Sequence, residues 1–444
     1  MHDLVIKNGT IITCDSSDRV VENGFVAVSQ GKIALIASAD DIPVPNAATV
    51  RDACGSIIMP GLINAHTHLP MTLFRGLADD LALADWLNSH IFPAEAAHIN
   101  RQSVFDGTLL ACGEMLLNGI TTCCDGYFLE DEVAQAVNIS GMRAVLGQGV
   151  IGFPAPGAPN PEKAVEIAGQ FVNQWKNAGN PLIRPSIFCH SPYTCSAKTI
   201  QEAKQRARDL GVLFQIHASE TRFERETSVS AHSKSPIAYL HDLGVLDADT
   251  LVIHSIWVDK ADVRLLSQSG SCVCICPGSH TKLASGIAPV KLLEEEGVCV
   301  ALGTDGPASN NSADMFREMG LAARLGKILT HDPTQSPADK VIRMATVDAA
   351  KAVGIKDITG SLEVGRQADI IVVDTNAPHL TPCYNPKSLL VYSATGADVS
   401  MVLVAGRIVV QDKKLLTFDV KAAMARVAEI AERIARKNEP ENKH

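Results

Sequence analysis

The chain has 444 residues, 46% of them hydrophobic and 20% charged, which is enough to bury a large core and a second, smaller domain. Its formal net charge of −10, with no basic cluster, argues against nucleic acid or an anionic membrane as a partner. No run of about 18 apolar residues could span a bilayer. The first residues, MHDLVIK, lack the charged n-region and long apolar core of a signal peptide, so we expect a cytoplasmic protein whose 12 cysteines are reduced.

Short strands are predicted near both ends of the chain. Residues 4–13 (LVIKNGTIIT) and 24–29 (GFVAVS) are β-rich and bordered by Asn-Gly and Gln-Gly turn signals. The same texture returns at 370–374 and 400–410, without helical patterns between these runs. We therefore expect one small β-sandwich domain built from both termini. It would comprise residues 1–56 and 360–420, and a C-terminal helix and tail would follow over 421–444.

Residues 57–68, IIMPGLINAHTH, combine an apolar run with two histidines one residue apart. Along a strand, positions i and i+2 point to the same side, so His66 and His68 can project into one cavity and hold one metal ion. Such a pair alone is weak evidence, because most histidines in proteins are structural. The prediction gains strength from matching residues further along the chain.

Strand-like and helix-like segments alternate over residues 57–359. Amphipathic helical patterns cover 102–118, 161–178 and 197–210. With the strand that leads to His66, eight strand signals occupy roughly 250 residues, which predicts an α/β fold of the (β/α)8 TIM-barrel type. An open doubly wound sheet is the alternative, but no G-x-G-x-x-G motif follows the first strand. The other seven strand-like runs end near Asp125, Gly149, His190, His217, His254, Cys276 and Asp305.

Several of these strands end in a polar residue that can do chemistry. In a barrel, the C-terminal ends of the strands form the catalytic face. The residues at these ends would therefore converge, although they lie far apart in the sequence. They are His66, His68, His190, His217, His254 and Asp305.

Imidazoles and a carboxylate at one site are suitable ligands for zinc, which lowers the pKa of a bound water towards neutrality. The best ligand set is His66, His68, His217 and Asp305. Glu220 follows His217 by three residues and could shuttle a proton between water and a substrate nitrogen; a solvated loop acid is the alternative. His254 could orient the water, and Asp305 could accept a proton as well as bind the metal.

These motifs resemble the amidohydrolase superfamily. The resemblance rests on PGLINAHTH (60–68), HASE (217–220), the pair His254-Ser255, GTDG (303–306) and GSLEVGRQADIIVVD (360–374). Within the superfamily, the chain is most similar to deaminases of S-adenosylhomocysteine and 5′-methylthioadenosine. That likeness is carried by DWL (85–87), PAE (93–95), HSPY (190–193), LASGIAPV (283–290) and DGPASNN (305–311).

The resemblance implies one metal ion on the ligands named above, with Glu220 and His254 handling protons. It also implies that Glu95 and His190 contact the nucleoside, and that Trp86 and Glu95 belong to a ribose-binding segment. Dinuclear members bridge two metals with a modified lysine or a glutamate at the fourth strand. Here that strand ends in Cys189-His190, which favours a single metal.

A metal site built on cysteine is not favoured. The H-x-E…P-C-x-x-C signature of the unrelated zinc deaminases is absent. Cys272, Cys274 and Cys276 alternate along a strand and would share one face. A buried core strand explains them better, because free cysteine is among the most buried residue types.

The sequence departs from the nucleoside-deaminase pattern near the expected substrate tail. Gln148 stands near the place where some members carry arginine, and the loop 153–161 (FPAPGAPNP) contains no basic residue. His280 stands where asparagine is usual. These departures leave the metal chemistry intact but favour a substrate with a shorter or less charged tail.

We therefore predict a metal-dependent hydrolytic deaminase of an adenosine-type nucleoside: 5′-methylthioadenosine, S-adenosylhomocysteine or adenosine. One divalent ion per chain is expected, zinc in the first place and Fe²⁺ as the alternative. The alternative function is a triazine-type or other aminated-heterocycle hydrolase, such as a chlorohydrolase or a guanine or pterin deaminase. A third possible function is that of a non-catalytic metal-binding scaffold protein. The expected partner is a small-molecule substrate, and a homo-oligomer is expected.

Overall fold

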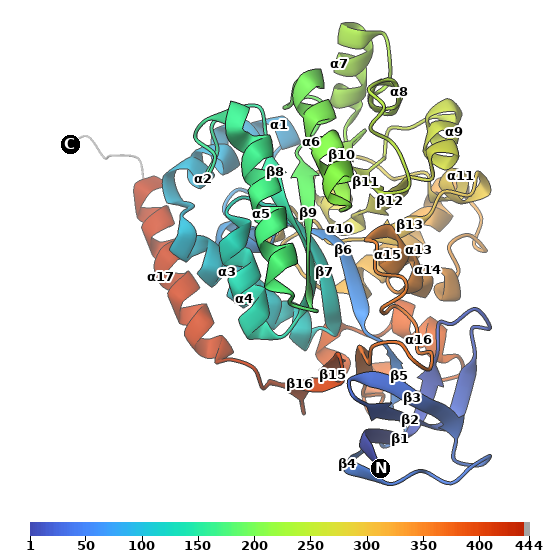
Figure 1. Cartoon of the computed structure of the whole chain (residues 1–444). Coiled ribbons are helices and arrows are strands. Elements are labelled where there is room, and N and C mark those ends of the chain that lie inside the picture. The colour runs from blue at the N-terminus through green and yellow to red at the C-terminus, as the bar shows by residue number, and fades with distance from the viewer. Residues whose placement is uncertain (439–444) are drawn as a thin grey trace.

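The structure, a computed structural model, describes residues 1–438 (Figure 1). Eight parallel strands follow one another in chain order, from β6 to β13. The first and last strands meet where the Asp305 N–H donates to the carbonyl oxygen of His66 at 3.0 Å. This confirms the predicted (β/α)8 barrel. Its strands are β6 (Leu62–Thr67), β7 (Ile120–Tyr127), β8 (Arg143–Val150), β9 (Ile183–Cys189), β10 (Phe214–Ala218), β11 (Thr250–His254), β12 (Cys272–Ile275) and β13 (Val300–Leu302).

Helices surround the barrel (Figure 1). Every residue of β7 and β8 is buried, as expected for strands covered on both faces. Helix bounds follow local signals: Asn100 forms a capping box at the start of α3, and Gly211 ends α6 with φ of +58°. The outer helices are α3 (Arg101–Leu117), α4 (Glu130–Ser140), α5 (Ala164–Ala178), α6 (Ala197–Leu210), α7 (Arg222–His232), α8 (Pro236–Asp242), α9 (Lys260–Ser269), α11 (Val290–Glu295), α13 (Met315–Thr330), α14 (Ala338–Met344) and α15 (Val347–Ala352).

Both termini build a second, nine-stranded mixed sheet, which confirms the small β-sandwich domain. Three of its strands, β3, β4 and β17, had no counterpart in the sequence analysis. The run 400–410 is a hairpin, because Ala405 and Gly406 turn the chain with positive φ. The strands are β1 (His2–Ile12), β2 (Val20–Ser29), β3 (Lys32–Ser38), β4 (Ala47–Asp52), β5 (Ile57–Pro60), β14 (Ile370–Val373), β15 (Val399–Val404), β16 (Arg407–Gln411) and β17 (Lys414–Leu415).

One predicted boundary needs correction. Residues 57–60 were assigned to the barrel, but they form β5, which pairs with β1 and β14 of the small sheet. The chain changes sheets at Gly61, whose N–H donates to the Asp369 carbonyl, while the Leu62 N–H donates to Gly119 in the barrel. A Cβ at Gly61 would lie 2.1 Å from Thr121 Oγ1, so only glycine fits this crossing. An apolar run does not reveal which sheet it joins.

A buried ion pair joins the barrel to the small domain. Arg143 on β8 donates from Nε to Asp369 Oδ2 at 2.8 Å, and Asp369 Oδ1 also accepts from the Ala405 N–H. On the other side, helix α17 (Val420–Asn438) runs along the barrel, and Arg426 contacts Asp106 of α3 at 2.7 Å. The predicted tail over 439–444 lies outside the described residues.

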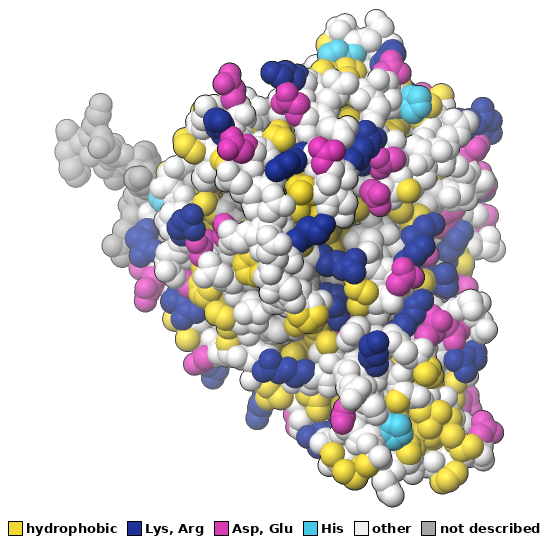
Figure 2. Space-filling view, in the orientation of Figure 1, with side chains coloured by type: hydrophobic (Ala, Val, Ile, Leu, Met, Phe, Trp, Pro, Cys, Tyr) yellow, Lys and Arg dark blue, Asp and Glu magenta, His cyan; other side chains and the backbone are white. Residues whose placement is uncertain are grey.

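Side chains of both charges are interspersed over the face shown in Figure 2. Within residues 1–438, no helix is both long and apolar enough to cross a bilayer. Short elements complete the fold, several of them over the C-terminal ends of the barrel strands. They are η1 (Leu69–Phe74), α1 (Leu83–Asp85), η2 (Trp86–Ile91), α2 (Phe92–His98), η3 (Pro161–Lys163), α10 (Pro277–Lys282), α12 (Pro307–Asn310), η4 (Pro378–Leu380), α16 (Pro386–Tyr392) and η5 (Gly396–Asp398).

Candidate active site

A cavity opens at the C-terminal ends of the barrel strands. The predicted polar residues line one part of it, and apolar side chains from the segment 83–92 line another. The cavity therefore has the composition expected of a small-molecule site. Its polar lining comprises His68, Glu95, Tyr127, His190, Tyr193, His217, Glu220, His254, Asp305 and Ser309.

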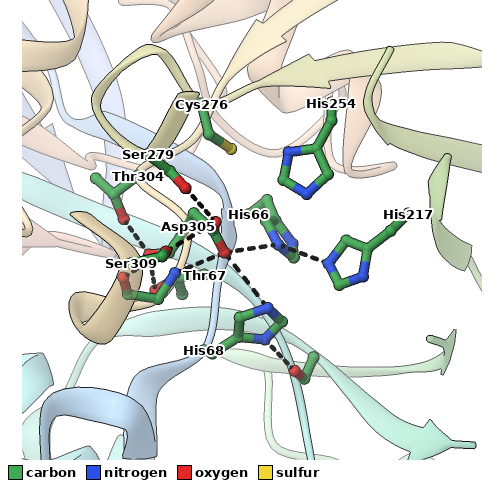
Figure 3. A network of polar contacts seen from close by, with 12 residues as sticks. His66, Thr67, His68, His217, His254, Cys276, Ser279, Thr304, Asp305 and Ser309 are labelled. Atoms are coloured by element: carbon green, nitrogen blue, oxygen red, sulfur yellow. Dashed lines mark hydrogen bonds and ion pairs between the residues drawn. The ribbon is translucent and has the colours of Figure 1, made fainter. Parts of the chain in front are cut away.

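Histidines from three strands and Asp305 point toward one another at the base of this cavity (Figure 3). His66 lies on β6 and His217 on β10, and their Nε2 atoms are 3.2 Å apart. Asp305 Oδ1 lies 3.5 Å from His66 Nε2 and 3.4 Å from His68 Nε2. Zinc–nitrogen bonds of about 2.0–2.1 Å in a tetrahedron imply ligand separations of about 3.3 Å. The donor spacing therefore suits a divalent metal ion.

The donors form two overlapping groups that share His66. His66, His68 and Asp305 are mutually within 4.8 Å, and so are His66, His217 and His254. His68 shows how the ring of one donor is oriented: a carbonyl can only accept, so His68 Nδ1 donates to the Gly126 carbonyl at 2.6 Å, and Nε2 of the neutral ring keeps its lone pair on the side that faces Asp305. The cluster is therefore preorganised for metal binding.

Asp305 is held in place by hydroxyl and backbone donors. Ser279 and Ser309 donate to Oδ2 at 2.7 and 2.9 Å, and the Gly306 N–H donates to Oδ1. Burial opposes ionisation of Asp305, but the bond from His66 and the charges of the neighbouring histidines outweigh it and hold its pKa well below the usual range. The Asp305 carboxylate is thus ionised at neutral pH and can serve as an anionic metal ligand.

Glu220 and His254 form the acid–base part of the site. Glu220 Oε2 lies 3.7 Å from His254 Nε2, and both side chains are buried. Burial, with the nearby Asp305 charge, raises the pKa of Glu220 well above its ordinary value. A carboxyl group whose pKa is raised in this way is better suited to act as a general acid than an exposed one.

The backbone around these groups is strained and well supported. His254 and Asp305 have φ values of +79° and +63°, and Ser219 has +58°. Glu224 accepts the N–H groups of Ser219 and Glu220 at 2.9 and 2.7 Å, so it fixes the turn that carries Glu220. Left-handed non-glycine residues gathered at one place are typical of functional sites.

The far side of the cavity is built by one helical stretch, α1–η2–α2, in which η2 is a π-helical turn. Trp86 and Glu95 project from it, and Glu95 Oε1 accepts a short hydrogen bond from the Tyr127 hydroxyl. Burial raises the pKa of Glu95 to about 7, although the Tyr127 bond opposes the shift. π-Turns often occur at functional sites, because the extra residue redirects side chains.

Comparison with known proteins agrees with this geometry. The model of the amidohydrolase family matches residues 57–409. The chain belongs to the amidohydrolase family.

Relatives of this amidohydrolase match along nearly the whole chain. A 5-methylthioadenosine/S-adenosylhomocysteine deaminase of Syntrophobacter fumaroxidans is 45% identical over 433 residues, covering 97% of this chain and 98% of the relative. A 5′-deoxyadenosine deaminase of Methanosarcina acetivorans is 42% identical over 442 residues, covering 99% and 100%.

Solved structures share the fold. The crystal structure of an adenosine deaminase from Xanthomonas campestris with bound zinc superposes with a TM-score of 0.95 at 37% identity, covering 98% of this chain and 99% of that one. An atrazine chlorohydrolase from Arthrobacter aurescens, in complex with zinc, has a TM-score of 0.88 at 20% identity, covering 96% and 100%. The latter likeness shows the fold alone.

Most residues predicted for the site of the amidohydrolase are brought together, but Gln148 is not. Gln148 was expected near the substrate tail. Instead its Oε1 accepts the Glu130 N–H at 3.1 Å, and it is absent from the cavity lining. The first N–H groups of helix α4 have no partner within the helix and attract the amide oxygen. His190 does line the cavity, with Nδ1 bonded to Thr194 Oγ1 at 2.9 Å.

Sequence analysis missed several supporting residues. Tyr127 lies two positions after Asp125, so strand alternation could have indicated that it faces the same side. No sequence pattern marked Glu224 or Ser279 as part of the site, because both act only through tertiary contacts with other site residues. Ser309 lay within a quoted motif but had no assigned role.

Proposed function

We propose that this amidohydrolase is a hydrolytic deaminase of adenosine-type nucleosides that releases ammonia. One observation carries the proposal: a single cavity is lined at one end by His68, His217, Asp305 and the Glu220–His254 pair, and at its other side by Glu95. The end of the cavity with the histidines, Asp305 and Glu220 suits attack on an aminated ring carbon. The side with Glu95 suits the binding of ribose hydroxyls. The names of the similar proteins from Syntrophobacter fumaroxidans and Methanosarcina acetivorans support the same substrate class.

The ligands that we propose for the metal are His66, His68, His217 and Asp305. One ion per chain is expected, with zinc first and ferrous iron as the alternative. The fourth strand, β9, is followed by His190, whose ring is engaged by Thr194 and which offers no bridging carboxylate. When bound, the ion supplies Lewis acidity that lowers the pKa of water.

The chain's own residues move the protons. Glu220, whose pKa is raised by burial, can donate a proton to the ring nitrogen beside the amino-bearing carbon. Asp305 and His254 Nε2 border the same cavity and offer acceptors for the proton of the attacking water. That proton can then pass to the departing amino group, while the hydroxyl proton of the adduct returns to Glu220 as the C–N bond breaks and the C=O bond forms. Water and nucleoside thus yield the keto product and ammonia, and Glu220 regains its proton.

The cavity also suggests a preference for the 5′ group. Among the residues that the structure describes, no lysine or arginine lines it, whereas Leu83, Leu87, Ile91 and Phe92 do. A charged amino-acid tail would find no cationic partner there. We therefore expect 5′-methylthioadenosine, 5′-deoxyadenosine or adenosine to react at least as well as S-adenosylhomocysteine.

The alternative is a hydrolase of triazines or other aminated heterocycles on the same scaffold. Glu95 separates the two, since a ribose-binding carboxylate has no evident use with a triazine. Ammonia release across nucleosides, adenine, guanine, a pterin and a triazine, at equal enzyme and zinc concentration, tests the proposal. Higher kcat/KM for every free heterocycle than for any nucleoside would overturn it. The expected homo-oligomer can be checked by light scattering.

A further inference from the structure

His280 makes a contact that the proposed function does not use. It lies on the short helix α10, is buried, and directs its ring back over the start of that helix. Its Nε2 lies 3.1 Å from Nδ1 of His254, with the ring centroids 5.3 Å apart. Two imidazole nitrogens at this distance share one proton, so one donates and the other accepts.

A third group decides which nitrogen carries the proton. The backbone N–H of Cys276 also points at His280 Nε2, at 3.4 Å. A backbone N–H can only donate. If His280 Nε2 were protonated, it would face the N–H of Cys276 and could not accept from either neighbour. His280 Nε2 therefore accepts, and His254 Nδ1 donates.

We propose that His280 is a positioning residue that holds His254 in the tautomer with its proton on Nδ1. The Nε2 lone pair of His254 is then directed at the cavity, where Glu220 Oε2 lies 3.7 Å away. In the other tautomer, Nε2 would carry a proton and could not accept one from water. This inference rests on the proposed function, in which His254 Nε2 is a proton acceptor.

The surroundings add to the need for such a partner. His254 has a φ of +79°, and its ring stacks on His217 at a centroid distance of 5.0 Å. Backbone and stacking set the plane of the ring, but neither distinguishes Nδ1–H from Nε2–H. Among the described residues, His254 Nδ1 makes its hydrogen bond with His280.

The same nitrogens suggest a rival interpretation. His254, His280 and Cys276 offer ligand atoms within 4.8 Å of one another, so they could hold a second metal ion. That would require a lone pair on His254 Nδ1 and would exclude the proton. The two interpretations therefore predict different protonation of one atom and different metal content.

The experiment uses zinc-loaded enzyme labelled with ¹⁵N-histidine, with long-range ¹H–¹⁵N spectra to report which nitrogen of His254 is protonated. Three variants accompany the wild type. His280→Gln places an amide oxygen near the position of Nε2, and His280→Leu removes the acceptor. Thr281→Val is the matched control, because its hydroxyl bonds only to carbonyls within α10.

We expect wild type, His280→Gln and Thr281→Val to show protonated Nδ1 and bare Nε2 on His254. His280→Leu should lose this single tautomer and at least about tenfold in kcat, with KM and zinc content unchanged, since general acid–base assistance contributes about 10²–10⁴-fold. If His280→Gln retains the kcat that His280→Leu loses, the effect comes from the hydrogen-bond acceptor at residue 280 and not from the volume of its side chain.

Three results would overturn the proposal: protonated Nε2 in the wild type, full kcat in His280→Leu, or a second zinc equivalent that His280→Leu loses. If no nucleoside releases ammonia, the proposed function fails by itself. The spectra still decide the tautomer, so the two failures remain distinguishable.

Discussion

Replacing Glu95 by alanine tests the substrate side of the site most directly. Glu95 Oε1 already accepts the Tyr127 hydroxyl, so we count one further hydrogen bond, donated by a ribose hydroxyl to Oε2, which is charge-assisted once Glu95 is ionised above its pKa of about 7. Such bonds contribute about 1.5–3 kcal/mol. At about 1.4 kcal/mol per factor of ten, kcat/KM for nucleosides should fall about 10- to 150-fold. Adenine, which lacks ribose, should be affected much less.

The assay compares kcat/KM for adenosine, 5′-deoxyadenosine, 5′-methylthioadenosine and adenine in wild type and Glu95→Ala. Tyr127→Phe serves as the matched variant, because it keeps the carboxylate and removes only the group that orients it. It should produce a smaller loss of the same kind. Zinc content and melting temperature establish that each variant is folded. An equal loss for adenine and nucleosides would refute the ribose-binding role of Glu95.

Four further outcomes are expected. Glu220→Gln should retain its metal but lose about 10²–10⁴-fold in kcat, and near wild-type turnover in a metal-loaded sample would reduce Glu220 to a loop acid. Metal analysis should find one divalent ion per chain, with activity lost on chelation and regained with zinc; activity that tracks a second equivalent would contradict the single site. Arg143→Met should cost about 3–5 kcal/mol in unfolding free energy by denaturant titration, because Asp369 stays buried and unpaired; an unchanged midpoint would show that the pair contributes nothing. Burial raises the pKa of Glu95 from 4.5 to about 7, so its stabilising effect is complete below about pH 4.5 and is lost as pH rises through 7. Between pH 5 and 8, thermal melts should therefore show wild type losing stability relative to Glu95→Gln, and parallel curves would argue against the shift.

The sequence by itself determined the barrel and the ends of its strands. Continuous apolar runs, each followed by a polar residue and an amphipathic helix, are local patterns. They can be recognised in the sequence without knowing how the elements pack. Once those runs are read as a barrel, chain topology places His66, His217, His254 and Asp305 at one face. Glu220 followed from its spacing after His217. These predictions needed only strand periodicity and the rule that strand ends converge.

Only the tertiary structure decided which side chains meet. Gln148 turns toward the free N–H groups of α4, Tyr127 bonds to Glu95, and His280 bonds to His254. Each contact joins elements that no local pattern connects, and each depends on rotamer and on competition among nearby donors. The assignment of residues 57–60 to the small sheet has the same origin, because an apolar strand is compatible with either sheet until Gly61 is seen to pass between them.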